Sequence, residues 1–225
     1  MTEVCATTDE AVAGVADGAT VLVGGFGLAG MPSALIDALI RQGATDLTVV
    51  CNNAGNGETG LAALLAAGRV RKVVCSFPRQ SDSWVFDRLY REGRIELELV
   101  PQGNLAERMR AAGAGIGAFY CPTGAGTLLA EGKETRVIDG RLHVLEHPIR
   151  GDVALIKARV SDRMGNLVYR KTARNFGPVM ATAATSTIVE VHRLVEPGAL
   201  DPEVVVTPGI FVDRVVVTGD QEGLA

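Results

Sequence analysis

Basic residues are not in excess in this 225-residue sequence, which contains 22 Lys and Arg and 26 Asp and Glu and has a net charge of −4. That balance argues against a nucleic-acid-binding surface. No apolar run approaches the roughly 20 residues that a membrane-spanning helix needs. The N-terminal MTEVCATTDEAV also lacks the basic stretch followed by an apolar one that marks a secretion signal. We therefore expect a cytoplasmic protein that binds neither nucleic acid nor membrane.

Cysteine pairs at metal-site or redox-site spacing are absent as well. The four cysteines lie far apart without a C-x-x-C, and three of them end or follow apolar runs, which predicts buried free thiols. No Pro/Ser-rich linker and no internal repeat interrupts the chain, so we expect one domain over residues 1–225. Glycine, in contrast, is abundant: 27 of 225 residues, or about 12%, against roughly 7% in average proteins. The glycines cluster in short loops, which predicts many tight turns.

The N-terminal half alternates apolar, strand-like runs with helix-like segments. Strands are predicted at 20–24, 47–51, 70–75 and 95–100, and helices at 7–18, 32–43, 58–68, 81–93 and 104–113. As N-caps of three of these helices we expect Thr7, either Ser81 or Asp82, and Asn104. The alternation predicts an α/β fold with an open, doubly wound, mostly parallel sheet flanked by helices.

After about residue 117 the pattern becomes β-rich. Asp139-Gly140 between two alternating runs predicts a hairpin, and further strands are expected at 152–160, 166–170, 187–191 and 211–217. One helix is expected within 176–186, where Pro178 limits its start. We expect this β-rich C-terminal part to cover the sheet.

The segment VLVGGFGLAGMPSAL contains G-x-G-x-x-G at Gly25, Gly27 and Gly30, between a predicted strand and a predicted helix. That pattern is typical of dinucleotide-binding loops, in which an acidic residue at the end of the second strand binds the ribose. Here the second strand ends in Cys51-Asn52-Asn53, without a carboxylate. The glycines therefore need an explanation other than a nicotinamide site.

Three more glycine-containing loops, at 52–57, 101–104 and 122–126, also follow apolar runs. Each loop alone is equally well explained as a simple turn. Because loops at the carboxyl ends of parallel strands converge, we expect a shared crevice lined by backbone amides of residues 24–30 and by Asn52, Asn53, Gln102, Asn104 and Thr123. Neutral donors near a helix start suit a carboxylate, a carbonyl or a phosphorylated carrier.

Several segments together resemble the A subunit of the family I CoA-transferases. The likeness runs over nearly the whole chain and includes VLVGGFGLAGMP after Asp17-Gly18, NNAGNGETGLAALL, VCSFPRQSDSWVFD, PQGNLAERMRAAGAGIGAFYCPTGAGTLLAEGKETR and YRKTARNFGPVMATAA. The resemblance implies the transfer of CoA from succinyl-CoA to a 3-oxo acid, with 3-oxoadipate as the first expectation and acetoacetate as the alternative. It also implies an A2B2 assembly with a B subunit, and a CoA thioester as substrate without a permanently bound cofactor.

The resemblance further implies ping-pong chemistry through a glutamate on the B subunit, so that no catalytic residue lies in this chain. Within the chain, Glu58 is the nearest acidic alternative, although a first-turn helix position explains it better. The family's CoA-contacting turn corresponds to Gly24, Gly25, Phe26, Gly27, Leu28, Ala29 and Gly30. The substrate-binding amides correspond to Asn52, Asn53 and Gln102.

Three other features have competing interpretations. HVLEH at 143–147 matches the H-x-x-E-H of zinc proteases, but Pro148 and the preceding hairpin favour an extended segment and no metal site. Arg79 is a hypothetical partner for the distal carboxylate of a dicarboxylic substrate. The cations of YRKTARN at 169–175 form either a solvated surface or a contact with CoA phosphate, a carboxylate or the partner.

Two functions of other kinds are also compatible with the scaffold. Isomerisation of a sugar phosphate on a similar fold would need a crevice carboxylate of its own, and the sequence offers none. A non-enzymatic small-molecule-binding domain would be favoured if the chain had no B subunit.

Overall fold

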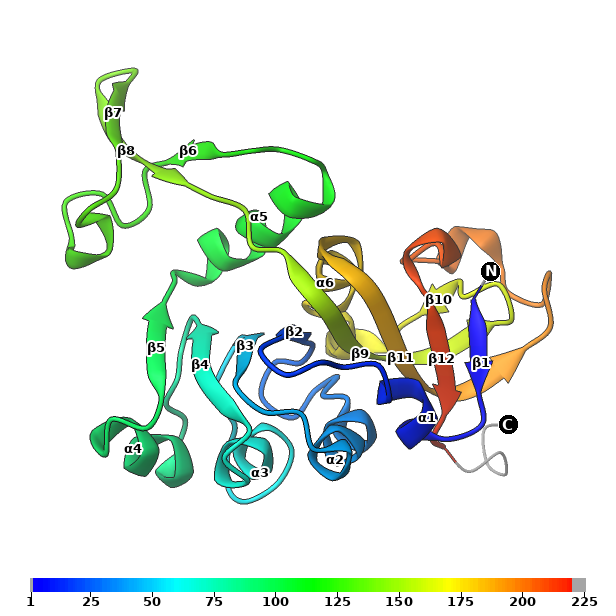
Figure 1. The fold of residues 1–225 in the computed structure, drawn as a ribbon. Helices are drawn as coiled ribbons and strands as arrows, with labels where there is room; N and C mark the ends of the chain where they lie inside the picture. Colours follow the sequence, from blue (N-terminus) through cyan, green and yellow to red (C-terminus); the bar gives the residue numbers. More distant parts are fainter. Residues whose placement is uncertain (1, 220–225) are drawn as a thin grey trace.

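The computed structural model describes residues 2–219. Its large sheet has the strand order β1 (Glu3–Cys5), β12 (Arg214–Val217), β11 (Ala184–Val195), β9 (Gly151–Asp162), β2 (Thr20–Val23), β3 (Leu47–Cys51), β4 (Val70–Cys75) and β5 (Glu96–Leu99). All pairings along this order are parallel, while the short β10 (Leu167–Val168) pairs antiparallel with β9. The predicted fold class, an open and mostly parallel sheet flanked by helices, is confirmed (Figure 1). The expectation that the β-rich C-terminal part covers the sheet was wrong: β9, β11 and β12 pair edge to edge with the other strands and extend the sheet.

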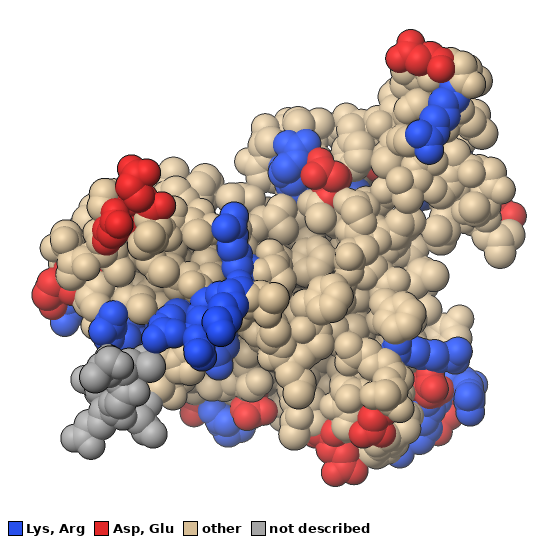
Figure 2. Space-filling model, turned by 180° about the vertical axis from the view of Figure 1, so that it is seen from behind, with Lys and Arg blue, Asp and Glu red and all other residues tan. Residues whose placement is uncertain are grey.

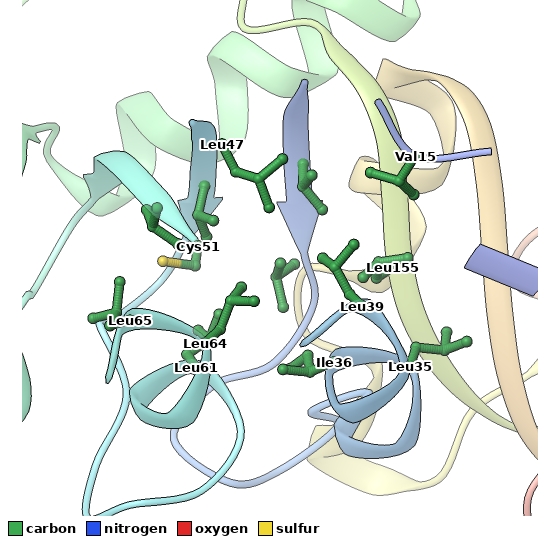
Figure 3. Close-up of a cluster of buried hydrophobic side chains, with 14 of the residues drawn as sticks. Val15, Leu35, Ile36, Leu39, Leu47, Cys51, Leu61, Leu64, Leu65 and Leu155 are labelled. Carbon is green, nitrogen blue, oxygen red and sulfur yellow. The ribbon is translucent and has the colours of Figure 1, made fainter. Parts of the chain in front are cut away.

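Helices cover both faces of this sheet. One face packs against α1 (Thr8–Val12), α2 (Ser33–Gln42), α3 (Leu61–Ala66) and α4 (Trp84–Arg91), and the other against α5 (Gln102–Gly113) and α6 (Gly177–Ala183). Figure 3 shows the first of these cores, in which leucines of α2 and α3 meet side chains of β3 and β9. Burial of such a side chain stabilises the fold by about 1.5–3 kcal/mol, which explains why these strands are apolar on both faces.

The direction of chain winding reverses between β2 and β9. From β2 the chain proceeds through β3 and β4 to β5 on one side, and from β9 it proceeds through β11 to β12 on the other. At such a reversal the loops beyond the carboxyl ends of the two adjacent strands diverge to opposite faces and leave a crevice, where ligands of open α/β sheets bind. The glycine-rich segment 24–30 follows β2 and therefore lies at this point.

A small antiparallel sheet of order β6 (Phe119–Cys121), β8 (Arg141–Glu146) and β7 (Thr135–Ile138) projects from the body (Figure 1). The predicted hairpin is confirmed: Asp139 and Gly140 have φ of 50° and 74°, as a two-residue turn between such strands requires. Glu146, 3% exposed, anchors this sheet to α5 by accepting from Asn104 at 3.2 Å, and it also pairs with Lys133 of the loop before β7 at 2.9 Å. His143 lies in the extended β8, as expected for the HVLEH segment.

Four short 3₁₀ helices complete the described structure, at Leu128–Ala130, Lys171–Arg174, Pro202–Val204 and Gly209–Phe211. The helix predicted within 176–186 is α6, with Pro178 in its first turn. Cys5, Cys51 and Cys75 are buried free thiols, as expected, whereas Cys121 is half-buried. Within the described residues, no helix has the length and apolarity that crossing a bilayer requires.

Three local expectations were wrong. Asn104 is not an N-cap: α5 begins at Gln102, and Asn104 lies inside it because its amide donates to the buried Glu146. Neither Ser81 nor Asp82 caps α4, whose N-cap position is Ser83; the Ser83 hydroxyl instead donates to the carbonyl of Gly55. Thr7 does cap α1 by accepting a hydrogen bond from the Glu10 amide, although this helix ends at Val12 and not near residue 18.

Candidate functional site

The loop after β2 is shaped by glycines that adopt positive φ. Gly25, Gly27 and Gly30 have φ of 123°, 60° and 73°, a region that residues with a Cβ rarely adopt. Between them Phe26 and Ala29 exchange two backbone hydrogen bonds of 3.0 and 3.1 Å, which close a tight turn. Phe26 and Leu28 remain 50% and 77% exposed. The loop thus presents apolar side chains and a compact backbone to the outside.

Gly30 is required by a contact within the chain itself. A Cβ at this position would lie 2.4 Å from the carbonyl oxygen of Ala173, which belongs to the 3₁₀ turn that precedes α6. The sequence pattern suggests close approach of a ligand at the glycines, but at Gly30 the close approach is made by another segment of the same chain. Gly27, in contrast, has open space around it, because a Cβ added there would have no neighbour nearer than 3.7 Å.

Asn175 holds this loop through both ends of its side-chain amide. Its Oδ1 accepts from the backbone N–H of Gly25 at 3.1 Å, and its Nδ2 donates to the carbonyl of Ala29 at 2.9 Å. The same amide also bonds the carbonyl of Thr172 and the N–H of Phe176. One side chain therefore links the start and the end of the glycine turn to the 172–176 segment.

Of the predicted substrate amides, Asn52 and Asn53 follow β3, and Gln102 opens α5 after β5. Asn52, 4% exposed, accepts hydrogen bonds through Oδ1 from Gln102 Nε2 at 2.7 Å and from Ser76 Oγ at 2.9 Å. Asn53 is 2% exposed, and its Oδ1 accepts from the backbone N–H of Gly55. Gln102 is exposed. Asn52 therefore orients Gln102, and of the three amides Gln102 is the one that reaches a cavity.

That cavity is a groove of about 710 Å³ between the glycine loop, α5 and α6. Phe26 and Gln102 lie on its walls together with Asn175, Phe176, Val179 and Phe211. Its walls are thus largely apolar, with a few neutral hydrogen-bonding groups and the ion pair of Glu107 with Arg110. A mostly apolar wall with a few polar groups is typical of a small-molecule site.

Among the described residues, no free nucleophile lines the groove. Glu107 is the carboxylate of its wall, and it is paired with Arg110 at 2.7 Å. Burial raises the pKa of Cys75 to about 12, and burial raises the pKa of Cys51 well above its ordinary value. Neither thiol is a thiolate at neutral pH, and neither lines the groove.

Other predicted site residues lie elsewhere. Asn104 and Thr123 meet each other, with the Asn104 amide donating to the Thr123 carbonyl at 3.4 Å, but neither lines the groove. Arg79 pairs with Asp87 and lines a separate hollow beside α4, so the structure does not bring it to the groove. Glu58 is exposed and precedes α3, so it does not occupy the first helical turn that we expected.

Sequence reasoning missed Asn175 and the apolar wall that follows it. The segment YRKTARN drew attention through its cations, whereas its asparagine makes the contact with the glycine loop. The sequence carries no local signal for this contact, because it joins residues 150 positions apart.

The sequence is similar to known proteins over nearly its whole length. The sequence model of the family described as Coenzyme A transferase matches residues 5–218. The chain is 71% identical to the A subunit of 3-oxoadipate CoA-transferase from Pseudomonas putida over 206 residues, which cover 92% of this chain and 89% of that protein. It is 54% identical to the A subunit of succinyl-CoA:3-ketoacid coenzyme A transferase from Xanthomonas campestris over 213 residues, covering 94% and 87%.

Solved structures share the fold. The apoenzyme of acyl-CoA transferase YdiF from Escherichia coli O157:H7 superposes with a TM-score of 0.88 at 24% identity, over 99% of this chain and 48% of that longer chain. A variant of the decarboxylase AibA/AibB superposes with a TM-score of 0.83 at 28% identity, over 97% of this chain and 84% of that one.

Proposed function

Since this chain belongs to the coenzyme A transferase family, we propose that it is the A subunit of a two-subunit enzyme that moves CoA from succinyl-CoA to 3-oxoadipate. The observation that carries the proposal is an incomplete site: a groove with a glycine loop and neutral donors, whose carboxylate is already paired. Such a site binds an acyl thioester but needs its nucleophile from another chain.

The glycine loop is the proposed binding element for the CoA thioester. Gly24, Gly25, Phe26, Gly27, Leu28, Ala29 and Gly30 contact CoA in this proposal. Gly27 has free space above its backbone, so a ligand can approach its N–H closely. A preorganised N–H aimed at the developing oxyanion contributes about 3 kcal/mol in other enzymes.

The amide group proposed to bind the acyl substrate is Gln102, oriented by Asn52 through the 2.7 Å hydrogen bond, with Asn53 shaping the loop beneath. A neutral amide donates to a carbonyl or carboxylate without placing a competing charge in the apolar groove.

The proposed chemistry is ping-pong transfer through a glutamate of the B subunit. The glutamate carboxylate attacks the thioester carbon, the CoA thiolate leaves, and a mixed anhydride forms. The thiolate then attacks the glutamyl carbonyl, which releases succinate and leaves a glutamyl-CoA thioester. The 3-oxo acid reverses both steps, so that CoA ends on the second substrate and the glutamate is regenerated.

An assembly with the B subunit, of A2B2 composition, follows from the same proposal. Relatives of this chain are named as A subunits, and Phe26 and Leu28 expose apolar surface beside the groove. An exposed apolar loop at an incomplete site is where a partner subunit is expected to close it.

Exchange assays test this proposal. We expect the purified chain alone to be inactive, and co-expression with its B subunit to give transfer between succinyl-CoA and 3-oxoadipate. Full activity of the single chain would contradict the division of roles. Faster exchange with acetoacetate than with 3-oxoadipate would favour the second candidate, a 3-ketoacid transferase, which the 54% identical relative supports.

A further inference from the structure

A second pocket, of about 410 Å³, lies on the other side of the glycine loop and is strongly basic. Gly30 and the 170–173 segment form part of its wall, and its cationic lining residues are Lys157, Arg159, Arg170 and Lys171. Figure 2 shows a concentrated group of Lys and Arg side chains to the left of the middle of the face turned away from Figure 1.

The charge of this pocket is largely unneutralised. Lys157 pairs with Glu190 at 2.9 Å, and Glu190 is 1% exposed and also accepts from the backbone N–H of Leu35. Within residues 2–219, in contrast, no carboxylate lies within ion-pair distance of Arg159 or Arg170. The same is true of Lys171 in that part of the chain.

Lys171 also has an unusual backbone. Its φ of 50° lies in the left-handed region, where a residue other than glycine, asparagine or aspartate is uncommon. Strain of this kind concentrates at ligand clamps, where the surrounding structure holds it. Here the neighbouring Ala173 carbonyl is fixed against Gly30, so the turn that carries Lys171 is locked to the glycine loop.

The basic pocket is continuous with the groove that contains Gln102. A cavity of about 630 Å³ lies between them; it shares Ala29, Lys171 and Thr172 with the basic pocket. It shares Phe26 and Asn175 with the groove. One path therefore runs from a neutral amide, over the glycine loop, to a group of cations.

From this arrangement we infer that the basic pocket binds the phosphate groups of the CoA nucleotide, while the thioester lies over the glycine loop. The inference rests on the proposed function. CoA has the matching distribution of groups: an uncharged arm that ends in the thioester, and a nucleotide end with a diphosphate and a 3′-phosphate. Guanidinium and ammonium groups bind phosphate oxygens through charge-assisted hydrogen bonds.

Calorimetric titration of the complex of this chain with its B subunit tests the inference, with CoA, dephospho-CoA and pantetheine as probes. The variants are Arg159→Gln and Lys171→Gly; the glycine suits the positive φ, so the second change removes the ammonium without adding strain. We expect each variant to weaken CoA binding by about tenfold or more, the usual effect of deleting a charge-assisted hydrogen bond. Pantetheine binding is expected to stay unchanged, and Arg159→Lys to restore most of the affinity for CoA.

Arg193→Ala is the matched control, because Arg193 is exposed and follows a lining residue, His192, on the same strand but points to the opposite face of the sheet. A lower affinity for CoA with an unchanged affinity for pantetheine supports the inference. The affinity for dephospho-CoA, which lacks the 3′-phosphate, then shows whether the pocket binds the 3′-phosphate or the diphosphate. The inference would be overturned if the variants lost as much affinity for pantetheine as for CoA, or if Arg193→Ala lost as much affinity for CoA as they do. It would also be overturned if the variants failed to retain the B subunit, because the cations would then belong to the interface between the two chains. Wild-type complex that binds CoA in this way but transfers nothing from succinyl-CoA would instead refute the proposed function alone.

Discussion

Replacement of Asn175 by alanine separates the loop-positioning role of this side chain from a merely structural one. The change removes two hydrogen bonds to the glycine loop, at the N–H of Gly25 and the carbonyl of Ala29. Gly25 is buried, so its N–H would be left without a partner and without water, whereas Ala29 is half-buried and partly hydrated.

The expected magnitude follows from these two groups. An orphaned buried polar group costs about 1–3 kcal/mol, and the half-buried carbonyl falls at the low end of that range. If displacement of the loop removes about 2–3 kcal/mol of transition-state stabilisation, kcat/KM falls roughly 30- to 150-fold, since about 1.4 kcal/mol corresponds to a factor of ten. Asn175→Asp keeps the acceptor for Gly25 but sets a carboxylate against the Ala29 and Thr172 carbonyls, so it is expected to be no better than alanine.

The assay is steady-state exchange between succinyl-CoA and 3-oxoadipate by the complex with the B subunit, with thermal unfolding measured in parallel. Asn166→Ala is the matched control: Asn166 Oδ1 likewise accepts from a remote backbone N–H, that of Gly209 at 2.9 Å, but it lies outside the groove and the basic pocket. We expect both variants to lose stability and only the Asn175 variant to lose kcat/KM. Wild-type kinetics in a folded Asn175→Ala complex, or an equal loss in the control, would refute the reasoning.

Three further expectations concern single residues. Gly30→Ala is expected to lower the free energy of unfolding, measured in urea, by roughly 1–3 kcal/mol more than Gly68→Ala does. Both positions have positive φ, but only the methyl group at position 30 would meet a backbone oxygen, that of Ala173. Equal decreases in the two variants would show that the turn carrying Ala173 moves away freely. Gln102→Ala is expected to slow both half-reactions, measured separately with succinyl-CoA and 3-oxoadipyl-CoA, and unchanged rates in both would remove Gln102 from the site. For Glu98, burial raises the pKa, but hydrogen bonds from Lys72 and Arg108 outweigh it, so that the net pKa is lowered. The advantage of wild type over Glu98→Gln, about 0.5–1 kcal/mol for such a half-exposed group, is therefore expected to be constant above the ordinary carboxyl pKa. It is expected to vanish as the pH falls through the lowered pKa, and a difference that persists at lower pH would contradict the assignment.

The sheet was predictable because its signals are local. The runs at β2 and β3 are short, apolar and rich in valine, as strands buried on both faces require, and β4 departs from this pattern only at Arg71 and Lys72. Each run is bounded by glycine or polar residues. The Asp139-Gly140 hairpin was predictable for the same reason, since two adjacent residues determine its turn type.

The errors arise where distant segments override local preference. Asn104 has the sequence of an N-cap, but a carboxylate 42 residues away binds its amide inside α5. Asn175 reaches Gly25 across 150 residues, a contact that no pattern in either segment encodes. The location of the groove was deducible from the topology, while the side chain that fixes its loop was not.

The pairing of β1 with β12 joins residues 3–5 to residues 214–216. Of the strands that the structure describes, the first to be synthesised, β1, therefore pairs with the last, β12. Until synthesis has passed residue 214, Glu3 to Cys5 have no hydrogen-bonding partner strand within the described sheet, and its border on that side stays open. Closure of this border is consequently a late, long-range event, and a nascent polypeptide stalled before residue 214 lacks the strand that residues 3–5 need.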